Sequence, residues 1–176
     1  KNVLVTNGFI DREPLETLLP YIDAMNIDVK AFNDNFYRDI CAGSLNPVRE
    51  AVEISATLCH VEITTLIIDG LNDSPQEIED LVSWLANIDK EIPFHLYRYH
   101  PNYEMDIPVT ARETMLELFK IAREYLAFGY IGNMAEIENN TYCPNCKNLL
   151  IERGYRVYTL GIEDGKCKSC GFEMRL

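Results

Sequence analysis

Residues 61–77 read VEITTLIIDGLNDSPQE, and this stretch indicates the class of fold. Its apolar run, Val61–Ile68, is typical of a buried strand. Gly70 to Asp73 supply turn residues, and SPQE then reads as a capping box with proline at the first helical position. A strand that leads through a short turn into a helix is the repeating unit of an α/β protein.

The same unit recurs along the chain. Strands are expected at Asn2–Thr6, Asn26–Lys30, Val61–Ile68, Phe94–His100 and Phe128–Ile131, and helices at Pro14–Ala24, Pro47–Leu58, Ser74–Asn87 and Thr110–Leu126. Asn46 is the expected cap of the second helix, and TARE (110–113) reads as another capping box. Such connections are right-handed and imply a parallel sheet, either open and doubly wound or curled as part of a barrel. Both arrangements bind ligands at the carboxyl ends of the strands.

Composition excludes several classes of protein. The chain has 176 residues, room for one domain and a small appendage, and a formal net charge of −12 without a basic stripe. We therefore expect neither nucleic acid nor an anionic membrane surface as a partner, and no apolar run approaches the ~20 residues of a membrane span. No GxGxxG or Walker loop indicates a nucleotide fold. Cys41 and Cys59 read as isolated thiols of a reduced, cytoplasmic compartment.

The stretch NIDVKAFND (26–34) carries an unexpected pair of charges. Asp28 and Lys30 share one face of a strand, although a parallel strand covered on both faces should be almost wholly apolar. One reading is a structural ion pair at the strand end. The other is a clamp for a zwitterion, in which Asp28 takes an ammonium group and Lys30 takes a carboxylate, as in an amino-acid moiety.

Other strand ends also carry polar side chains. In IPFHLYRYHP (92–101), His95 is expected on one face with Tyr97 and Tyr99, near the strand that carries Lys30, although a lone histidine is more often a packing residue. TNGF (6–9) reads as a turn, while Thr6 and Asn7 are alternatively ligand contacts. Thr64 shares a strand face with Glu62 and Leu66, and Gly70, Asn72 and Asp73 read as structural turn residues. 

From about Glu138 the pattern changes to short strands, glycines and two CxxC pairs, so we expect domains at 1–137 and 138–176. Cys143, Cys146, Cys167 and Cys170 have the spacing of a zinc ribbon or a rubredoxin-like site. A segment below ~40 residues usually needs a metal or disulfide to fold. Zinc is the first choice, and iron, which could relay electrons, is the alternative.

These stretches together resemble a known family. TNGF, DVKAFNDNFYRDICAG, VEITTLIIDGLNDS, IPFHLYRYHP and NTYCPNC occur in this order in radical S-adenosylmethionine (SAM) enzymes, notably homologues of the pyruvate formate-lyase activating enzyme and the radical SAM member of the AmmeMemoRadiSam system. The resemblance implies a partial (βα)6 barrel in which a 4Fe-4S cluster reduces SAM to methionine and a 5′-deoxyadenosyl radical. The radical takes hydrogen from a substrate, a glycine of a partner protein in the activating enzymes. By matching motif, Thr6 and Asn7 would line the SAM site, Asp28 and Lys30 would contact its methionine moiety, His95 its adenosine end, and Thr64 is a weaker candidate.

One departure from the family is decisive. The CxxxCxxC loop that holds the family's cluster is absent from this sequence, and the match begins at about the third barrel strand. We therefore expect that an upstream part is missing, that the chain alone is inactive, and that the unpaired edge along Asn2–Thr6 promotes self-association. Expected partners of the whole enzyme are a protein substrate and an electron donor such as flavodoxin or ferredoxin. The alternatives are a non-catalytic zinc-ribbon binding module, or a small-molecule enzyme that uses His95 and Lys30 as acid and base.

Overall fold

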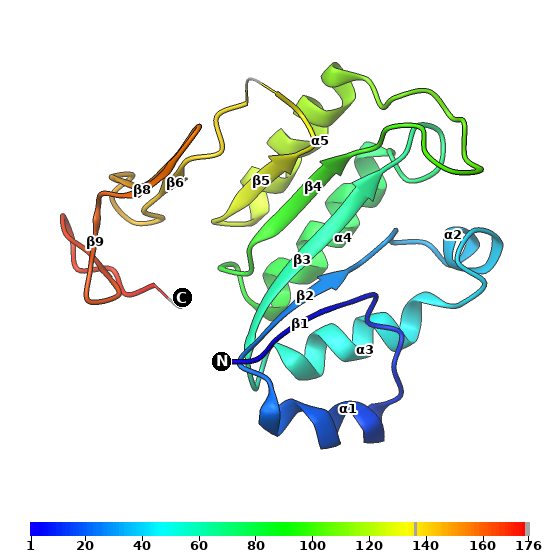
Figure 1. The fold of residues 1–176 in the computed structure, drawn as a ribbon, viewed down its shortest axis with the longest axis horizontal. Helices are drawn as coiled ribbons and strands as arrows, with labels where there is room; N and C mark the ends of the chain where they lie inside the picture. The colour runs from blue at the N-terminus through cyan, green and yellow to red at the C-terminus, as the bar shows by residue number, and fades with distance from the viewer. Residues whose placement is uncertain (136, 175–176) are drawn as a thin grey trace. The chain divides into compact units, whose positions relative to one another are not determined.

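The computed structural model describes residues 1–135 and 137–174. The chain forms two compact units, Lys1–Met134 and Ala135–Leu176, which run from blue to yellow and from yellow to red in Figure 1. None of the described helices is long and apolar enough to cross a membrane.

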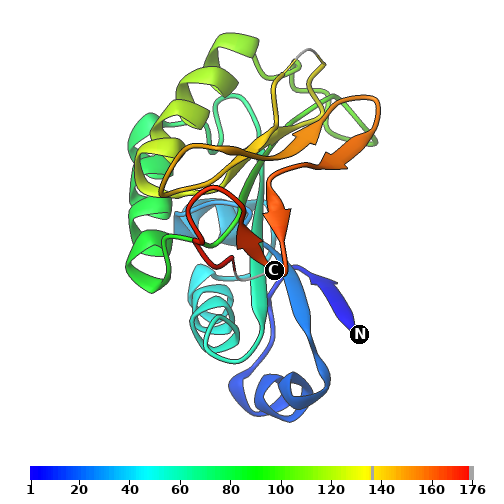
Figure 2. The same ribbon diagram turned by 90° about the vertical axis from the view of Figure 1, so that its left-hand side faces the viewer.

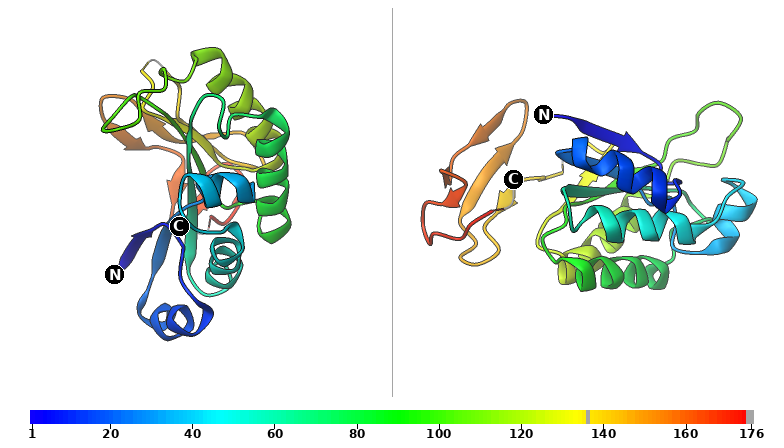
Figure 3. Two further views of the ribbon diagram at one scale, coloured as in Figure 1. Left: turned by 90° about the vertical axis from the view of Figure 1, so that its right-hand side faces the viewer. Right: turned by 90° about the horizontal axis from the view of Figure 1, so that it is seen from below.

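The first unit is built on one parallel sheet. Its strands β1 (Val3–Thr6), β2 (Ala24–Asp28), β3 (His60–Ile67), β4 (Phe94–Arg98) and β5 (Gly129–Gly132) lie side by side in chain order. The helices α1 (Arg12–Leu18), α3 (Leu45–Ser55), α4 (Pro75–Ile88) and α5 (Arg112–Tyr125) connect them and cover the same face, as Figures 2 and 3 show. Right-handed connections between strands in unbroken order put every helix on one side. The sheet is therefore an arc of a (βα) barrel, not a doubly wound sheet.

Covering one face gives the strands a clear alternation. Side chains that face the helices are fully buried, for example Ile27, Ile63 and Phe94, each 0% exposed. The opposite side chains are partly exposed and largely polar, and they form what we call the helix-free face: Asn26, Asp28, Lys30, His60, Glu62, Thr64, His95, Tyr97 and Tyr130. The polar residues on these parallel strands are thus explained by a sheet that is covered on one side.

Two helices, α1 and α3, depart most from the bounds that the sequence predicted. Instead of Pro14–Ala24, α1 ends at Leu18 and a short 3-10 turn follows, because Pro20 lacks the amide hydrogen that an α-helix would need there. Helix α3 begins at Leu45 rather than at Pro47, and its first amide donates to Asp34 Oδ1 at 3.2 Å, so the expected cap at Asn46 is wrong.

Both predicted capping boxes are also wrong, since within residues 1–135 neither α4 nor α5 has a side-chain N-cap. Glu77 accepts from the Phe32 amide at 2.7 Å and from Asn33 Nδ2 at 2.7 Å, so it secures the loop after β2 instead. Thr110 Oγ1 donates to Ile67 O at 2.6 Å. In both cases a tertiary hydrogen bond replaces the local one that the sequence suggests.

The short helix α2 (Asp34–Asp39) was not predicted from the sequence. Asn33 caps it by accepting from the Phe36 amide at 2.7 Å, and Phe36 and Tyr37 are buried beneath it. Six residues are too few to show a helical period, but a buried aromatic pair anchors the turn.

The second unit consists of short antiparallel strands. One sheet holds β6 (Thr141–Tyr142), β7 (Leu149–Arg153) and β8 (Val157–Thr159), and a two-stranded ribbon holds β9 (Ile162–Glu163) and β10 (Lys166–Cys167). Its core is small: Cys143, Leu150, Cys167 and Met174 are buried, with Ile151, Ile162 and Phe172 packed against them. So small an apolar core favours a metal as the main source of stability.

Candidate functional site

Four side chains from neighbouring strands form one row on the helix-free face. The register pairs Asp28 with Thr64, Thr64 with His95, and His95 with Tyr130. The rings of His95 and Tyr130 are stacked with their centroids 5.2 Å apart. Three of the residues singled out from the sequence are thereby brought together by the fold.

Lys30 follows the row at the carboxyl end of β2. Its Nζ lies 2.6 Å from Asp28 Oδ2, and the two side chains are 38% and 30% exposed. The backbone of Lys30 is held on both sides, because its amide donates to Tyr37 Oη at 3.0 Å and its carbonyl accepts from Asn72 Nδ2 at 2.7 Å. Burial raises the pKa of Tyr37 to about 12, so this hydroxyl stays neutral. Without a ligand, Asp28 and Lys30 form a structural ion pair, which is one of the two alternatives that the sequence left open. A bound zwitterion would have to break this ion pair and form one with each of the two side chains.

A second polar layer lies nearer the start of the strands, and the sequence reading did not select it. Glu62 Oε2 lies 2.8 Å from His95 Nε2, and Glu62 Oε1 lies 3.3 Å from His60 Nε2. These hydrogen bonds, from His60 and then His95, lower the pKa of Glu62 to about 2 against the opposing effect of burial. Beside them, Thr64 Oγ1 donates to Asn26 Oδ1 at 2.9 Å. The period-two alternation His60, Glu62, Thr64 within an apolar strand was the available signal.

Thr6 and Asn7 lie apart from this row. Thr6 is paired with the buried Ile27, so its side chain is on the helix-covered side, where Oγ1 accepts from the Gly8 amide at 3.1 Å. Asn7 Oδ1 accepts from the Phe9 amide at 3.0 Å. Both side chains therefore stabilise the turn. Gly8 has φ +68°, and a Cβ there would lie 2.8 Å from Ile27 Cγ2, which makes glycine necessary.

The prediction that Tyr99 shares the strand face of His95 and Tyr97 is wrong. Strand β4 ends at Arg98, and Tyr99 is buried with its hydroxyl donating to Met105 O at 2.6 Å, so it does not continue the face of His95 and Tyr97. His100 Nε2 lies 3.1 Å from Asn133 O and joins the segments that follow β4 and β5.

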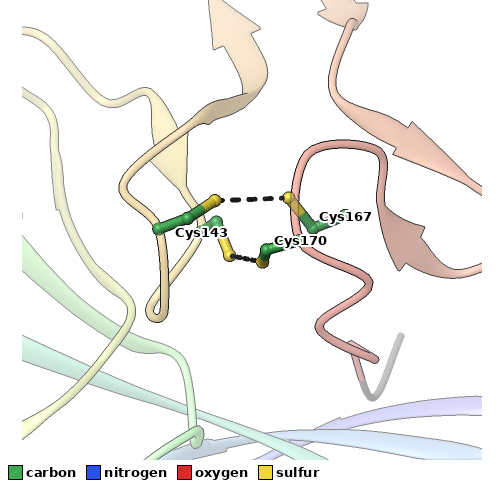
Figure 4. A group of neighbouring side chains, drawn as sticks. Cys143, Cys167 and Cys170 are labelled. Atoms are coloured by element: carbon green, nitrogen blue, oxygen red, sulfur yellow. Dashed lines mark hydrogen bonds between the residues drawn. The ribbon is translucent and has the colours of Figure 1, made fainter.

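The four cysteines of the second unit converge on one point. Figure 4 shows Cys143, Cys167 and Cys170 directed toward each other from two loops. Cys143 Sγ is 3.6 Å from Cys170 Sγ, Cys146 Sγ is 3.6 Å from Cys167 Sγ, and all four sulfurs lie within 4.8 Å of one another. A tetrahedral ion with metal–sulfur bonds of ~2.3 Å requires sulfurs about 3.8 Å apart. The geometry therefore fits a single ion, whereas four-iron clusters hold their thiolates farther apart.

In residues 1–135 and 137–174 these cysteines are the sole set of three or more His, Cys, Asp or Glu side chains placed to hold a metal. Cys41 and Cys59 are isolated thiols. A 4Fe-4S cluster therefore does not fit the side chains described in the first unit, in agreement with the missing CxxxCxxC motif.

Comparison with known proteins identifies the fold. No family model matches the chain. An uncharacterized protein of Methanocaldococcus jannaschii is 40% identical over 178 residues, which cover 97% of this chain and 53% of that protein. The chain thus spans about half the length of the curated relative that it matches.

Three solved structures share the fold. A domain of a pyruvate-formate lyase-activating enzyme from Bacteroides vulgatus has a TM-score of 0.67 at 16% identity, covering 75% of this chain and 81% of that one. A radical SAM methyltransferase from Sphaerobacter thermophilus has a TM-score of 0.51 at 17% identity, and the match covers 84% of this chain and 43% of that one. TYW1 with a lysine–pyruvate adduct bound has a TM-score of 0.50 at 20% identity, and the match covers 71% of this chain and 41% of that one. The fold is that of a partial radical SAM barrel with a small four-cysteine unit, and the likeness concerns the fold alone.

Proposed function

We propose that this chain is the C-terminal part of a radical SAM enzyme that resembles the activases of glycyl-radical enzymes, and that its helix-free face binds SAM. The observation that carries the proposal is the charged pair Asp28 and Lys30 at the strand ends, continued across the sheet by Thr64 and His95. Likeness in fold to radical SAM enzymes supports it. The expected substrate is a protein or a small molecule that gives up a hydrogen atom.

Each side chain has a distinct role in this proposal. Asp28 accepts hydrogen bonds from the SAM ammonium group, and Lys30 pairs with its carboxylate, so one ion pair of the free protein becomes two with the ligand. Thr64 offers a hydroxyl between them and His95, which contacts the adenosine end. Strands are ~4.8 Å apart, so Asp28 and His95, two strands away from each other, are about 10 Å apart along the row, a span suited to an extended SAM molecule.

A 4Fe-4S cluster, when bound, supplies the electron that cleaves SAM. The described residues of the first unit offer no ligands for this cluster. We therefore assign the ligands to a part of a longer protein that these 176 residues do not match, as in the uncharacterized relative, of which they match 53%. In the enzyme as a whole, an electron donor such as flavodoxin or ferredoxin would reduce the cluster. The ribbon cysteines hold zinc rather than iron in this proposal, since a structural site needs no redox chemistry.

The test divides SAM into its two halves. In NMR titrations of the 176-residue chain, methionine should perturb the signals of Asp28 and Lys30, adenosine those of His95, and SAM all three. Asp28→Asn and Lys30→Met should abolish the methionine response. Asp39→Asn breaks an exposed ion pair on α2, 2.7 Å from Arg38, and should leave every response unchanged. Perturbations that avoid the row, or none at millimolar SAM, would refute the site.

The second candidate is a non-catalytic zinc-ribbon module that binds a protein. It is favoured by β8, all three residues of which are exposed, and by its neighbours Tyr155 and Leu160, which are 102% and 46% exposed. An exposed apolar edge strand is a typical docking surface. A chain that binds one zinc per molecule but neither methionine nor adenosine would favour this candidate over the first.

A further inference from the structure

Binding of SAM to the row accounts for His95 but not for His60 and Glu62, which form a hydrogen-bonded cluster with it. His60 and Glu62 lie two residues apart on β3, and His95 comes from β4, so all three side chains are on the helix-free face. Their side chains are 28%, 37% and 22% exposed, so solvent or a ligand can reach them. The three are not placed to hold a metal, since the four cysteines are the sole such set among the described residues.

The hydrogen bonds fix which ring nitrogens carry protons. Each histidine directs Nε2 at a different oxygen of Glu62, at 3.3 Å for His60 and 2.8 Å for His95. An ionised carboxylate only accepts hydrogen bonds, so both Nε2 atoms must donate. In a neutral imidazole the other nitrogen, Nδ1, then holds a lone pair. For His95 no partner of Nδ1 occurs within the described residues, and its ring is kept in place by stacking on Tyr130.

This arrangement is that of an oriented base. A carboxylate behind a histidine selects one tautomer and stabilises the imidazolium that forms when the other nitrogen takes a proton. A carboxylate partly removed from water on a sheet also carries a desolvation cost, which a purely apolar residue would avoid. Both features point to a chemical use.

We propose that His60, Glu62 and His95 form a proton-accepting site on the helix-free face, in which Glu62 is a positioning residue that keeps Nε2 of His95 protonated and Nδ1 free to accept. Its substrate carries an ionisable O–H or N–H group. The X–H bond of that group breaks, the electron pair stays on X, and the proton forms Nδ1–H on His95. The Nε2–H bond stays intact and continues to donate a hydrogen bond to ionised Glu62, so the imidazolium forms beside a negative charge. The use of the helix-free face as a ligand-binding face rests on the proposed function.

The first measurement is the tautomer of each of the three histidines in the 15N-labelled chain, read from long-range 15N–1H correlations with the imidazoles neutral. We expect Nε2–H at His60 and His95. In Glu62→Gln the carboxamide offers one oxygen and an NH2 group, so only one of the two rings can keep Nε2–H and the other should switch to Nδ1–H. His100, bonded to Asn133 O, should not change, and neither should any histidine in Glu117→Gln, an exposed position on α5. 

His95 in the Nδ1–H form in the unmodified chain would overturn the proposal, as would tautomers that Glu62→Gln leaves unchanged. If Glu62→Gln does not fold, which loss of the His100 signal would reveal, the tautomer in the unmodified chain decides alone.

The second measurement tests whether Nδ1 accepts. Diethyl pyrocarbonate reacts with an accessible imidazole lone pair, so peptide mapping should find His95 modified, and in Glu62→Gln the reaction at Nδ1 should slow at the ring that has switched to Nδ1–H. An unmodified His95 beside a modified His100 would leave Glu62 with a structural role only and overturn the proposal. Neither measurement requires SAM, so a failure of SAM binding is a separate result. Protection of His95 by SAM would bear on the proposed function alone.

Discussion

Asn72 joins the ends of two strands: its Nδ2 donates to Lys30 O at 2.7 Å and to Leu66 O at 2.8 Å. Its Oδ1 accepts from the Ile68 amide at 2.7 Å, and the residue is 1% exposed. One buried amide thus satisfies three backbone groups where β2 and β3 leave the sheet, and it fixes the backbone that carries the Lys30 side chain.

Asn72→Ala should therefore destabilise the first unit by about 3 kcal/mol, since buried backbone groups left without partners cost ~1–3 kcal/mol each and partial rehydration recovers some of it. Urea unfolding followed by far-UV circular dichroism measures the change. Asn87→Ala, at an exposed position of α4, is the control and should change stability little or favour the helix. A loss at Asn72 no larger than at Asn87 would show that water replaces the lost hydrogen bonds.

Asn72 also shows how far the sequence determines the fold. Turn chemistry correctly predicted Gly70, Asn72 and Asp73 as structural, and apolar periodicity predicted the five strands of the parallel sheet and the helices α1, α3, α4 and α5. Helix ends were less predictable. Glu77 and Thr110 look like local caps in the sequence, but each bonds a strand end or loop that is distant in the chain. Such partners are known only once the sheet has assembled.

The candidate site divides in the same way. The two CxxC spacings predicted the sulfur cluster, because each pair folds locally and the two pairs need only meet. The alternation of Asp28 and Lys30 predicted their shared face. The contact of Glu62 with His95 spans two strands and depends on the register, which the sequence does not specify, so this pair was missed.

The 176-residue chain should not cleave SAM. Its described residues outside the ribbon offer no set of thiolates for a 4Fe-4S cluster, and the sequence has no CxxxCxxC motif. After anaerobic reconstitution with iron and sulfide, addition of dithionite and SAM should give no 5′-deoxyadenosine above the level of a sample without protein, measured by liquid chromatography. Formation of 5′-deoxyadenosine that is lost in Cys143→Ser would mean that the ribbon cysteines carry the cluster.

Removal of the ribbon metal should unfold the second unit and leave the first folded. Among the described residues of this unit, the buried core beside Cys143 and Cys167 consists of Leu150 and Met174, whereas structural zinc supplies ~10–16 kcal/mol of apparent binding energy. In NMR spectra of Cys167→Ser, amide signals of residues 138–174 should collapse to unfolded positions while those of the sheet persist, and bound metal should fall from one per chain to none. Cys59→Ser, which removes an isolated thiol, is the control. Retained dispersion in residues 138–174 would show that the small core suffices.

The stability that Glu62 contributes should depend on pH. The hydrogen bonds of His60 and His95 lower its pKa from an ordinary 4.5 to about 2, so the folded state binds this proton less readily than the unfolded state. The contribution is complete above about pH 4.5 and is lost as the pH falls toward about 2. The difference in unfolding free energy between the unmodified chain and Glu62→Gln should therefore shrink as the pH is lowered from about 6 to about 3. A difference that stays constant over this range would mean that the carboxylate gains nothing from the two imidazoles.

The free edge of β1 should make the chain self-associate. Strand β1 is an end strand of the sheet, and its side chains on the helix-free side, Val3 and Val5, are 66% and 73% exposed. Unpaired amide and carbonyl groups beside exposed valines favour pairing with another strand, while the net charge of −12 opposes it, so association should grow with salt as well as with protein concentration. Light scattering after size-exclusion chromatography measures the mass.

Val5→Lys places a charge on the edge of the sheet and should shift the chain toward monomer. Val109→Lys adds the same charge at an exposed position outside the strands and should leave the association unchanged. A monomer at every concentration and salt level would show that the chain already protects this edge.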